Sequence, residues 1–175
     1  MEEVILVDQF DHELGTKEKL LAHQEGLLHR AFSIFILNSK GQMLLHQRAL
    51  GKYHSGGLWT NACCSHPRPG ESINNAAERR LKEEMGFHTE LSPLFCLLYH
   101  AQVSDDLVEH EFDHVLVGTF DGPIDKINPE EVAAFRWVDI PDLFEEMAHA
   151  PKNFTEWFKL ALPKVVNLTC NRSPS

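Results

Sequence analysis

The segment from Ser72 to Gly86 constrains the fold most, because the sequence marks both ends of a helix there. Ser72 can cap the first turn, the interior is rich in Ala and Glu, and Gly86 can stop the helix after Met85. The β-rich segments on either side of it cover residues 31–37, 42–47, 95–101 and 111–120. One central helix between groups of strands predicts a mixed α/β fold.

Weaker signals complete this pattern. They predict a strand at 3–7, a helical turn at 17–23, a hairpin turn at 38–41, a loop at 51–57, and helices at 141–148 and 153–160. With 175 residues, of which 43% are hydrophobic, the chain is large enough for one domain with a core and too small for two. We therefore expect a single domain over residues 1–175, with a frayed tail at 171–175.

The charge balance limits the classes of partner. The net charge is −10, and phosphate binding needs clustered Lys and Arg, so nucleic acids and anionic membranes are poor candidates. An anionic small molecule would have to be held by a local basic pocket or by a metal ion.

Cysteine usage and the first residues indicate the compartment. Two of the four cysteines, Cys63 and Cys64, are adjacent, which suits a disulfide framework badly. The start of the chain lacks a basic region followed by a long apolar one, and the longest apolar run, 31–37, is too short to span a bilayer. We expect a cytoplasmic protein, with no signal peptide, that is a monomer or a weak homodimer.

The central helix carries the first candidate site. Arg79 and Arg80 lie one turn from Glu83 and Glu84. Such a pattern is typical of a solvated ion-pair face, but it also suits a magnesium site that receives a diphosphate, since hard cations prefer carboxylate and phosphate oxygens.

The spacing around this helix resembles the Nudix box, G-x5-E-x7-R-E-U-x-E-E-x-G-U, where U is a bulky apolar residue. The matching residues are Glu71, Arg79, Leu81, Glu83, Glu84, Gly86 and Phe87. Two positions differ, because Ser65 replaces the first glycine and Arg80 replaces the glutamate that a hydrolytic Nudix enzyme normally needs for its metals. The substitution argues against pyrophosphate hydrolysis, and an arginine there can instead hold a diphosphate through paired hydrogen bonds.

A second motif lies just before this box. Residues 60–67 match T-N-x-x-C-x-H-P, with the cysteine at Cys64 and the histidine at His66. Such a pair can be a buried thiol beside a loop histidine, or two metal ligands. Together with the modified box, the string resembles the type 1 isopentenyl-diphosphate isomerase family, in which these positions are a catalytic acid/base and a metal ligand.

Two further motifs fit the same family. Glu109 and Glu111 alternate, so on a strand they face one side, and by themselves they are typical of a solvated strand end. His23 and His29 precede a strand, where histidines are more often hydrogen-bonded than metal-bound. The resemblance implies that these four residues and His66 bind one metal, and that Glu111 is also the second acid/base. Three imidazoles favour a transition metal, zinc is more often four-coordinate, and the choice among Mn, Mg and Zn stays open.

The resemblance assigns the remaining site residues. It implies that Glu84 binds a magnesium ion that arrives with the substrate diphosphate, that Tyr99 lies beside the second acid/base, and that Trp157 faces a developing cation. From spacing alone, Trp157 fits equally well as a core residue beside Phe154 and Phe158. The residues that it implies for diphosphate binding are Lys19, Arg48, Lys52 and Arg80.

The resemblance covers nearly the whole chain, from about Val4 to about Leu160. It implies a Nudix fold, a mixed β-sheet sandwiched between helices, and an enzyme that interconverts isopentenyl and dimethylallyl diphosphate. Proton addition at one carbon and removal at another require two complementary groups, Cys64 and Glu111. The alternatives are a Nudix hydrolase acting on another diphosphate and a catalytically silent Nudix binding module. We further expect Cys64 to face the pocket as a reactive thiol, and Cys63 to face the core.

Overall fold

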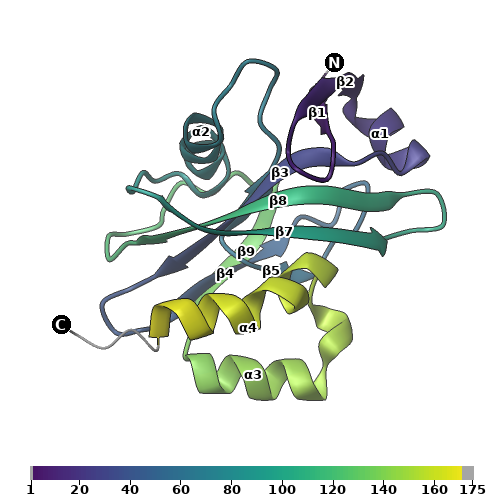
Figure 1. Cartoon of the computed structure of the whole chain (residues 1–175). Helices are drawn as coiled ribbons and strands as arrows, with labels where there is room; N and C mark the ends of the chain where they lie inside the picture. Colours follow the sequence, from purple (N-terminus) through teal and green to yellow (C-terminus); the bar gives the residue numbers. More distant parts are fainter. Residues whose placement is uncertain (1, 171–175) are drawn as a thin grey trace.

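A computed structural model describes residues 2–170 and contains one mixed β-sheet with helices packed on it (Figure 1). The strands are β1 (Glu3–Val7), β2 (Glu13–Glu18), β3 (His29–Leu37), β4 (Met43–Arg48), β5 (Trp59–Thr60), β6 (Cys63–Ser65), β7 (Ser92–Gln102), β8 (Val108–Thr119) and β9 (Val132–Val138). The helices are α1 (Lys19–Glu25), α2 (Ile73–Met85), α3 (Ile140–His149) and α4 (Glu156–Cys170), with a 3-10 turn, η1 (Pro151–Asn153). No helix in these residues is long and apolar enough to cross a membrane.

Strand β3 is the organising strand of the sheet. It runs parallel to β8 from the pair His29↔Glu111 to the pair Leu37↔Thr119. It also pairs antiparallel with β1 and with the short strand β6. On its far side β8 pairs antiparallel with β7. The strands that carry the sequence motifs therefore meet at one end of β3.

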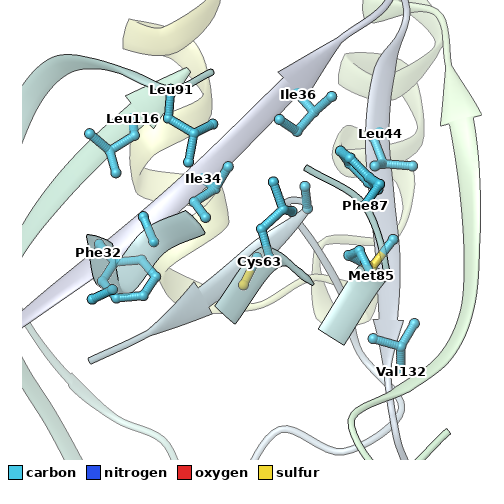
Figure 2. Packing of buried hydrophobic residues seen from close by; sticks show 14 residues of the cluster. Phe32, Ile34, Ile36, Leu44, Cys63, Met85, Phe87, Leu91, Leu116 and Val132 are labelled. Atoms are coloured by element: carbon cyan, nitrogen blue, oxygen red, sulfur yellow. The ribbon is translucent and has the colours of Figure 1, made fainter. Parts of the chain in front are cut away.

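Two apolar layers cover the faces of the sheet, because successive side chains of β3 point to opposite sides. Ile34 and Ile36 belong to one buried cluster with Leu81 and Met85 of α2. Figure 2 shows Ile34, Ile36 and Met85 in this cluster. Phe35 points the other way and packs against Phe158 of α4. Helices α3 and α4 lie on this second face (Figure 1). The predicted sheet between helices is confirmed.

Both predicted ends of the central helix are confirmed. The side chain of Ser72 accepts a hydrogen bond from the backbone N–H of Asn75 at 3.2 Å, as a cap of the first turn does. Gly86 ends the helix with φ 77°, and its N–H bonds to the carbonyl of Lys82. A Cβ on Gly86 would lie 2.4 Å from the carbonyl oxygen of Lys126, so the position needs glycine for its conformation and for its close contact.

The predicted hairpin between residues 31 and 47 is present only at its turn. Strands β3 and β4 pair solely at Leu37↔Met43. Beyond the turn β3 continues with β8, while β4 pairs with β9. The local turn signal was right, and long-range pairing decided the rest of the ladder.

Other differences have local causes. Strand β2 was missed because it is an exposed edge strand of mixed polarity, and the predicted helical turn at 17–23 is really its end followed by α1. Strand β9 was missed because only two of its seven residues are buried. Helix α4 continues past the predicted end at residue 160 and holds Pro163 inside it, although proline removes a helical hydrogen bond. The tail expected at 171–175 lies outside the described residues.

Candidate active site

Five histidine and glutamate side chains from four parts of the chain meet at the end of β3. They are His23, His29, His66, Glu109 and Glu111, and one ligand atom of each lies within 4.8 Å of the others. The register of β3 and β8 makes His29 and Glu111 direct neighbours, and alternation along β8 turns Glu109 to the same side. Helix α1 supplies His23, and His66 directly follows β6.

The hydrogen bonds of this cluster leave one ligand atom of His23 and one of Glu109 without a partner. Backbone carbonyls accept from Nδ1 of His23 at 2.7 Å and Nδ1 of His29 at 2.8 Å, which fixes each Nε2 toward the centre. The Nε2 atom of His23 and the Oε2 atom of Glu109 are buried, 3.4 Å apart, and have no hydrogen-bond partner. Buried orphan atoms are rare, so this donor set fits a divalent metal.

Neighbouring groups control the charges in the cluster. Burial works to raise the pKa of Glu111, but the imidazoles of His29 and His66 outweigh it and bring that pKa well below its usual range. Burial lowers the pKa of His66 to about 4 against the opposing effect of Glu111. A carboxylate and a neutral imidazole are the forms that bind metals. The hydroxyl of Tyr99, the cross-strand neighbour of Glu111, donates to its Oε1.

Cys64 lies beside this cluster on β6, and its side chain lines the cavity as expected. Its thiol donates to Oδ1 of Asn61 at 3.1 Å, and the indole N–H of Trp157 donates to its sulfur at 2.8 Å. The expected activation of this thiol depends on a bound metal ion and stays a prediction. Burial and then the charge of Asp113 raise the pKa of Cys64, although Ser33, Asn61 and Arg48 act to lower it. The resting thiol is therefore protonated.

Cys63 faces the opposite side of β6, as expected, and is fully buried among residues of the α2 layer (Figure 2). It still has a polar partner, because its thiol donates to Oε2 of Glu84 at 2.6 Å. Burial raises the pKa of Glu84, while Arg80 and this hydrogen bond act to lower it. The predicted magnesium ligand is thus a buried carboxylate that Cys63 helps to hold.

The cavity lies beside Cys64 and is also lined by Trp157, Glu84 and Glu111. Four basic side chains line it: Lys19, Arg48, Lys52 and Arg80. Three of them are paired with carboxylates, Lys19 with Glu2 at 2.9 Å, Lys52 with Glu131 at 2.5 Å, and Arg80 with Glu83 at 2.6 Å. The guanidinium of Arg48 lies 5.3 Å from the centre of the Trp157 ring.

Trp157 combines both interpretations that the sequence left open. Its side chain is 4% exposed and belongs to the cluster that contains Phe154 and Phe158. It also lines the cavity, with its N–H on the sulfur of Cys64. The residue is part of the core and of the cavity wall at once.

Known proteins resemble the chain over nearly its whole length. Residues 27–158 match the NUDIX domain family. An isopentenyl-diphosphate Delta-isomerase of Burkholderia multivorans is 57% identical over 90% of this chain and 89% of its own length. One of Serratia proteamaculans is 55% identical over 90% and 87%. The chain belongs to the isopentenyl-diphosphate Delta-isomerase family. The sequence motifs of this chain are therefore compared with those of the isomerase family within the Nudix superfamily.

Solved structures agree with this fold. A Deinococcus radiodurans protein superposes with a TM-score of 0.75 at 19% identity, covering 98% of this chain and all of that chain. A MutT Nudix hydrolase of Burkholderia pseudomallei gives a TM-score of 0.57 at 18% identity, covering 79% and 98%. At these identities the likeness concerns the fold alone, and it shows that this isomerase-family chain has the Nudix fold.

Sequence reasoning missed two residues that belong to this isomerase-family site. His54, in the loop before β5, is 2.7 Å from Glu109 through its Nε2 atom. Glu131, just before β9, pairs with Lys52 and lies 3.6 Å from Arg80. Neither has a spacing relation to a metal or phosphate motif. His54 could have been noticed as a histidine in a loop, but Glu131 had no such feature, so the sequence offered no strong signal for either residue.

Proposed function

We propose that this protein interconverts isopentenyl diphosphate and dimethylallyl diphosphate. The observation that carries the proposal is that Cys64 and Glu111 line one cavity in opposite protonation states, beside a cluster suited to a metal. Isomerisation adds a proton to one carbon of an allylic unit and removes one from another, so it needs one loaded and one empty proton-transfer group.

The walls of the cavity suit a cationic intermediate. Protonation of an unactivated alkene generates positive charge on a tertiary carbon, which water would capture. The indole of Trp157 can stabilise such charge without acting as a nucleophile. The hydroxyl of Tyr99 is bonded to Glu111 and can orient its carboxylate toward the substrate.

The histidine and glutamate cluster would hold a divalent metal ion, with Mn, Mg and Zn as candidates. When bound, the ion adds positive charge at Glu111 and so keeps that carboxylate in place and tunes its acidity. A separate magnesium ion is proposed at Glu84, arriving with the diphosphate, since magnesium commonly shares few protein ligands with substrate phosphates.

The basic residues of the cavity would hold the diphosphate. Three of these residues lie in ion pairs with carboxylates, namely Lys19, Lys52 and Arg80. A bound diphosphate would replace Glu2 and Glu131 as the partner of these cations. Arg80 occupies the position of a glutamate that hydrolytic Nudix enzymes use for metal binding. This substitution favours isomerisation over the alternative, hydrolysis of a diphosphate.

The organisation and setting follow the same proposal. We take residues 1–175 as one catalytic domain that acts in the cytoplasm on a small prenyl diphosphate, as a monomer or weak homodimer. Nucleic acids and membranes are not among its proposed partners, given the net charge of −10.

One incubation tests the function. Metal-loaded protein is mixed with isopentenyl diphosphate, and both dimethylallyl diphosphate and inorganic phosphate are measured. Isomer without phosphate release is the expected result. Phosphate release would instead indicate a hydrolase, and binding with neither product would indicate a silent binding module.

A further inference from the structure

We propose that His54 is a positioning residue of the metal centre. Its side chain holds the carboxylate of Glu109 so that one oxygen alone binds the ion. This inference rests on the metal centre of the proposed function and adds a residue to it. His54 is not one of the five converging ligands, and no motif of the sequence marks it.

The two oxygens of Glu109 have different surroundings. Its Oε1 atom lies 2.7 Å from Nε2 of His54, which is close enough for an imidazole N–H to donate to it. Its Oε2 atom lies 3.4 Å from Nε2 of His23, and both of these atoms are buried without a hydrogen-bond partner. One oxygen is thus occupied by His54, and the other faces the metal position.

His54 is itself held firmly. It is 6% exposed, and its Nδ1 atom lies 3.1 Å from the hydroxyl of Ser55. Its carbonyl accepts a hydrogen bond from Arg48. Its ring makes T-shaped contacts with the rings of Trp157 and Tyr53, at centroid distances of 6.0 Å and 4.6 Å. Since Ser55 has a φ of 56°, unusual for a residue with a side chain, the loop keeps a costly conformation at this point.

These contacts make His54 a support for a ligand and not a ligand. Both ring nitrogens already have partners in Glu109 and Ser55. Without the donor on Oε1, the carboxylate of Glu109 could rotate or bind through both oxygens. Partners of this kind fix the orientation of metal ligands, and losing one typically costs about 10- to 100-fold in metal affinity.

The test is a titration of the metal-free protein with Co²⁺, followed by its visible absorption and by competition with a chelator. His54→Ala should weaken Co²⁺ binding about 10- to 100-fold and alter the absorption bands, because the geometry of Glu109 changes. His54→Gln keeps an N–H donor at similar reach and should recover most of the affinity. His88→Ala, which removes an imidazole with 64% side-chain exposure that pairs with Glu78, is the matched control and should bind Co²⁺ like the unaltered protein.

Thermal unfolding of the metal-free variants separates positioning from packing. If His54→Ala binds Co²⁺ as tightly as the unaltered protein, or if His54→Gln is as weak as His54→Ala, His54 does not act through its N–H donor and the inference is wrong. Assaying the unaltered protein with isopentenyl diphosphate in parallel shows whether isomerisation stands regardless. Failure of the unaltered protein to bind Co²⁺ would remove the metal centre and this inference together.

Discussion

At the scale of single residues, two adjacent cysteines have different environments because neighbouring side chains of a strand point to opposite faces. Cys64 shares the cavity with Trp157, whereas Cys63 is buried under α2 and bonded to Glu84. The proposal assigns proton transfer to the first and a supporting role to the second.

Substituting each cysteine tests this assignment. Cys64→Ala should slow isomerisation by about 100- to 10,000-fold, the usual cost of removing a general acid or base, while metal content stays unchanged. Cys63→Ala leaves a buried oxygen of Glu84 without its donor and should lower the free energy of unfolding by about 1–3 kcal/mol. Rate assays and urea unfolding of both variants measure these effects. Near-normal turnover in Cys64→Ala, with loss in Cys63→Ala, would reverse the assignment.

A buried histidine near the cysteine motif makes stability depend on pH. His46 donates from Nδ1 to the carbonyl of Ala62, and burial lowers its pKa from 6.5 to about 4. The unfolded chain therefore binds more protons than the folded one between these values, and the stability present above pH 6.5 is lost as the pH falls toward 4.

His46→Asn keeps an N–H donor but cannot titrate, so it isolates this effect. Between pH 8 and pH 4.5, we expect the metal-free protein to lose about 2–3 kcal/mol more unfolding free energy than His46→Asn does. Urea unfolding at several pH values gives both curves. Parallel curves would mean that His46 is not the source of the dependence.

At the scale of elements, register and helix ends place the site. The β3–β8 ladder sets His29 beside Glu111, and the β3–β6 ladder sets Ser33 beside Cys64. Helix α2 brings Arg80 and Glu84 to the same cavity, and its length is fixed by Ser72 and Gly86. A helix that ended elsewhere would shift both charged side chains.

Two glycines test the importance of the helix end. Gly86 and Gly70 both have positive φ, 77° and 81°, but only Gly86 has a backbone neighbour where a Cβ would stand. Gly70→Ala should cost about 1 kcal/mol, for the left-handed conformation alone. Gly86→Ala should cost clearly more in denaturant unfolding, because the chain near Lys126 must also move. Equal losses would show that the close contact is relieved without cost.

At the scale of the whole molecule, the sequence predicted what local chemistry determines. Capping and stopping residues marked α2, and the family resemblance grouped the five residues that the structure brings together. Long-range pairing was not visible, so the separation of β3 from β4 was missed. His54 was missed for the same reason, since only the fold brings its loop to Glu109.

The measurement that tests the central claim most directly is isomerisation in D₂O. Protons on Cys64 and Glu111 exchange with solvent, so a product formed through them must gain deuterium. With metal-loaded protein and isopentenyl diphosphate, mass spectrometry should find dimethylallyl diphosphate with deuterium in a methyl group, and phosphorus NMR should find the diphosphate intact. Unlabelled dimethylallyl diphosphate, or inorganic phosphate in its place, would contradict proton transfer by this pair.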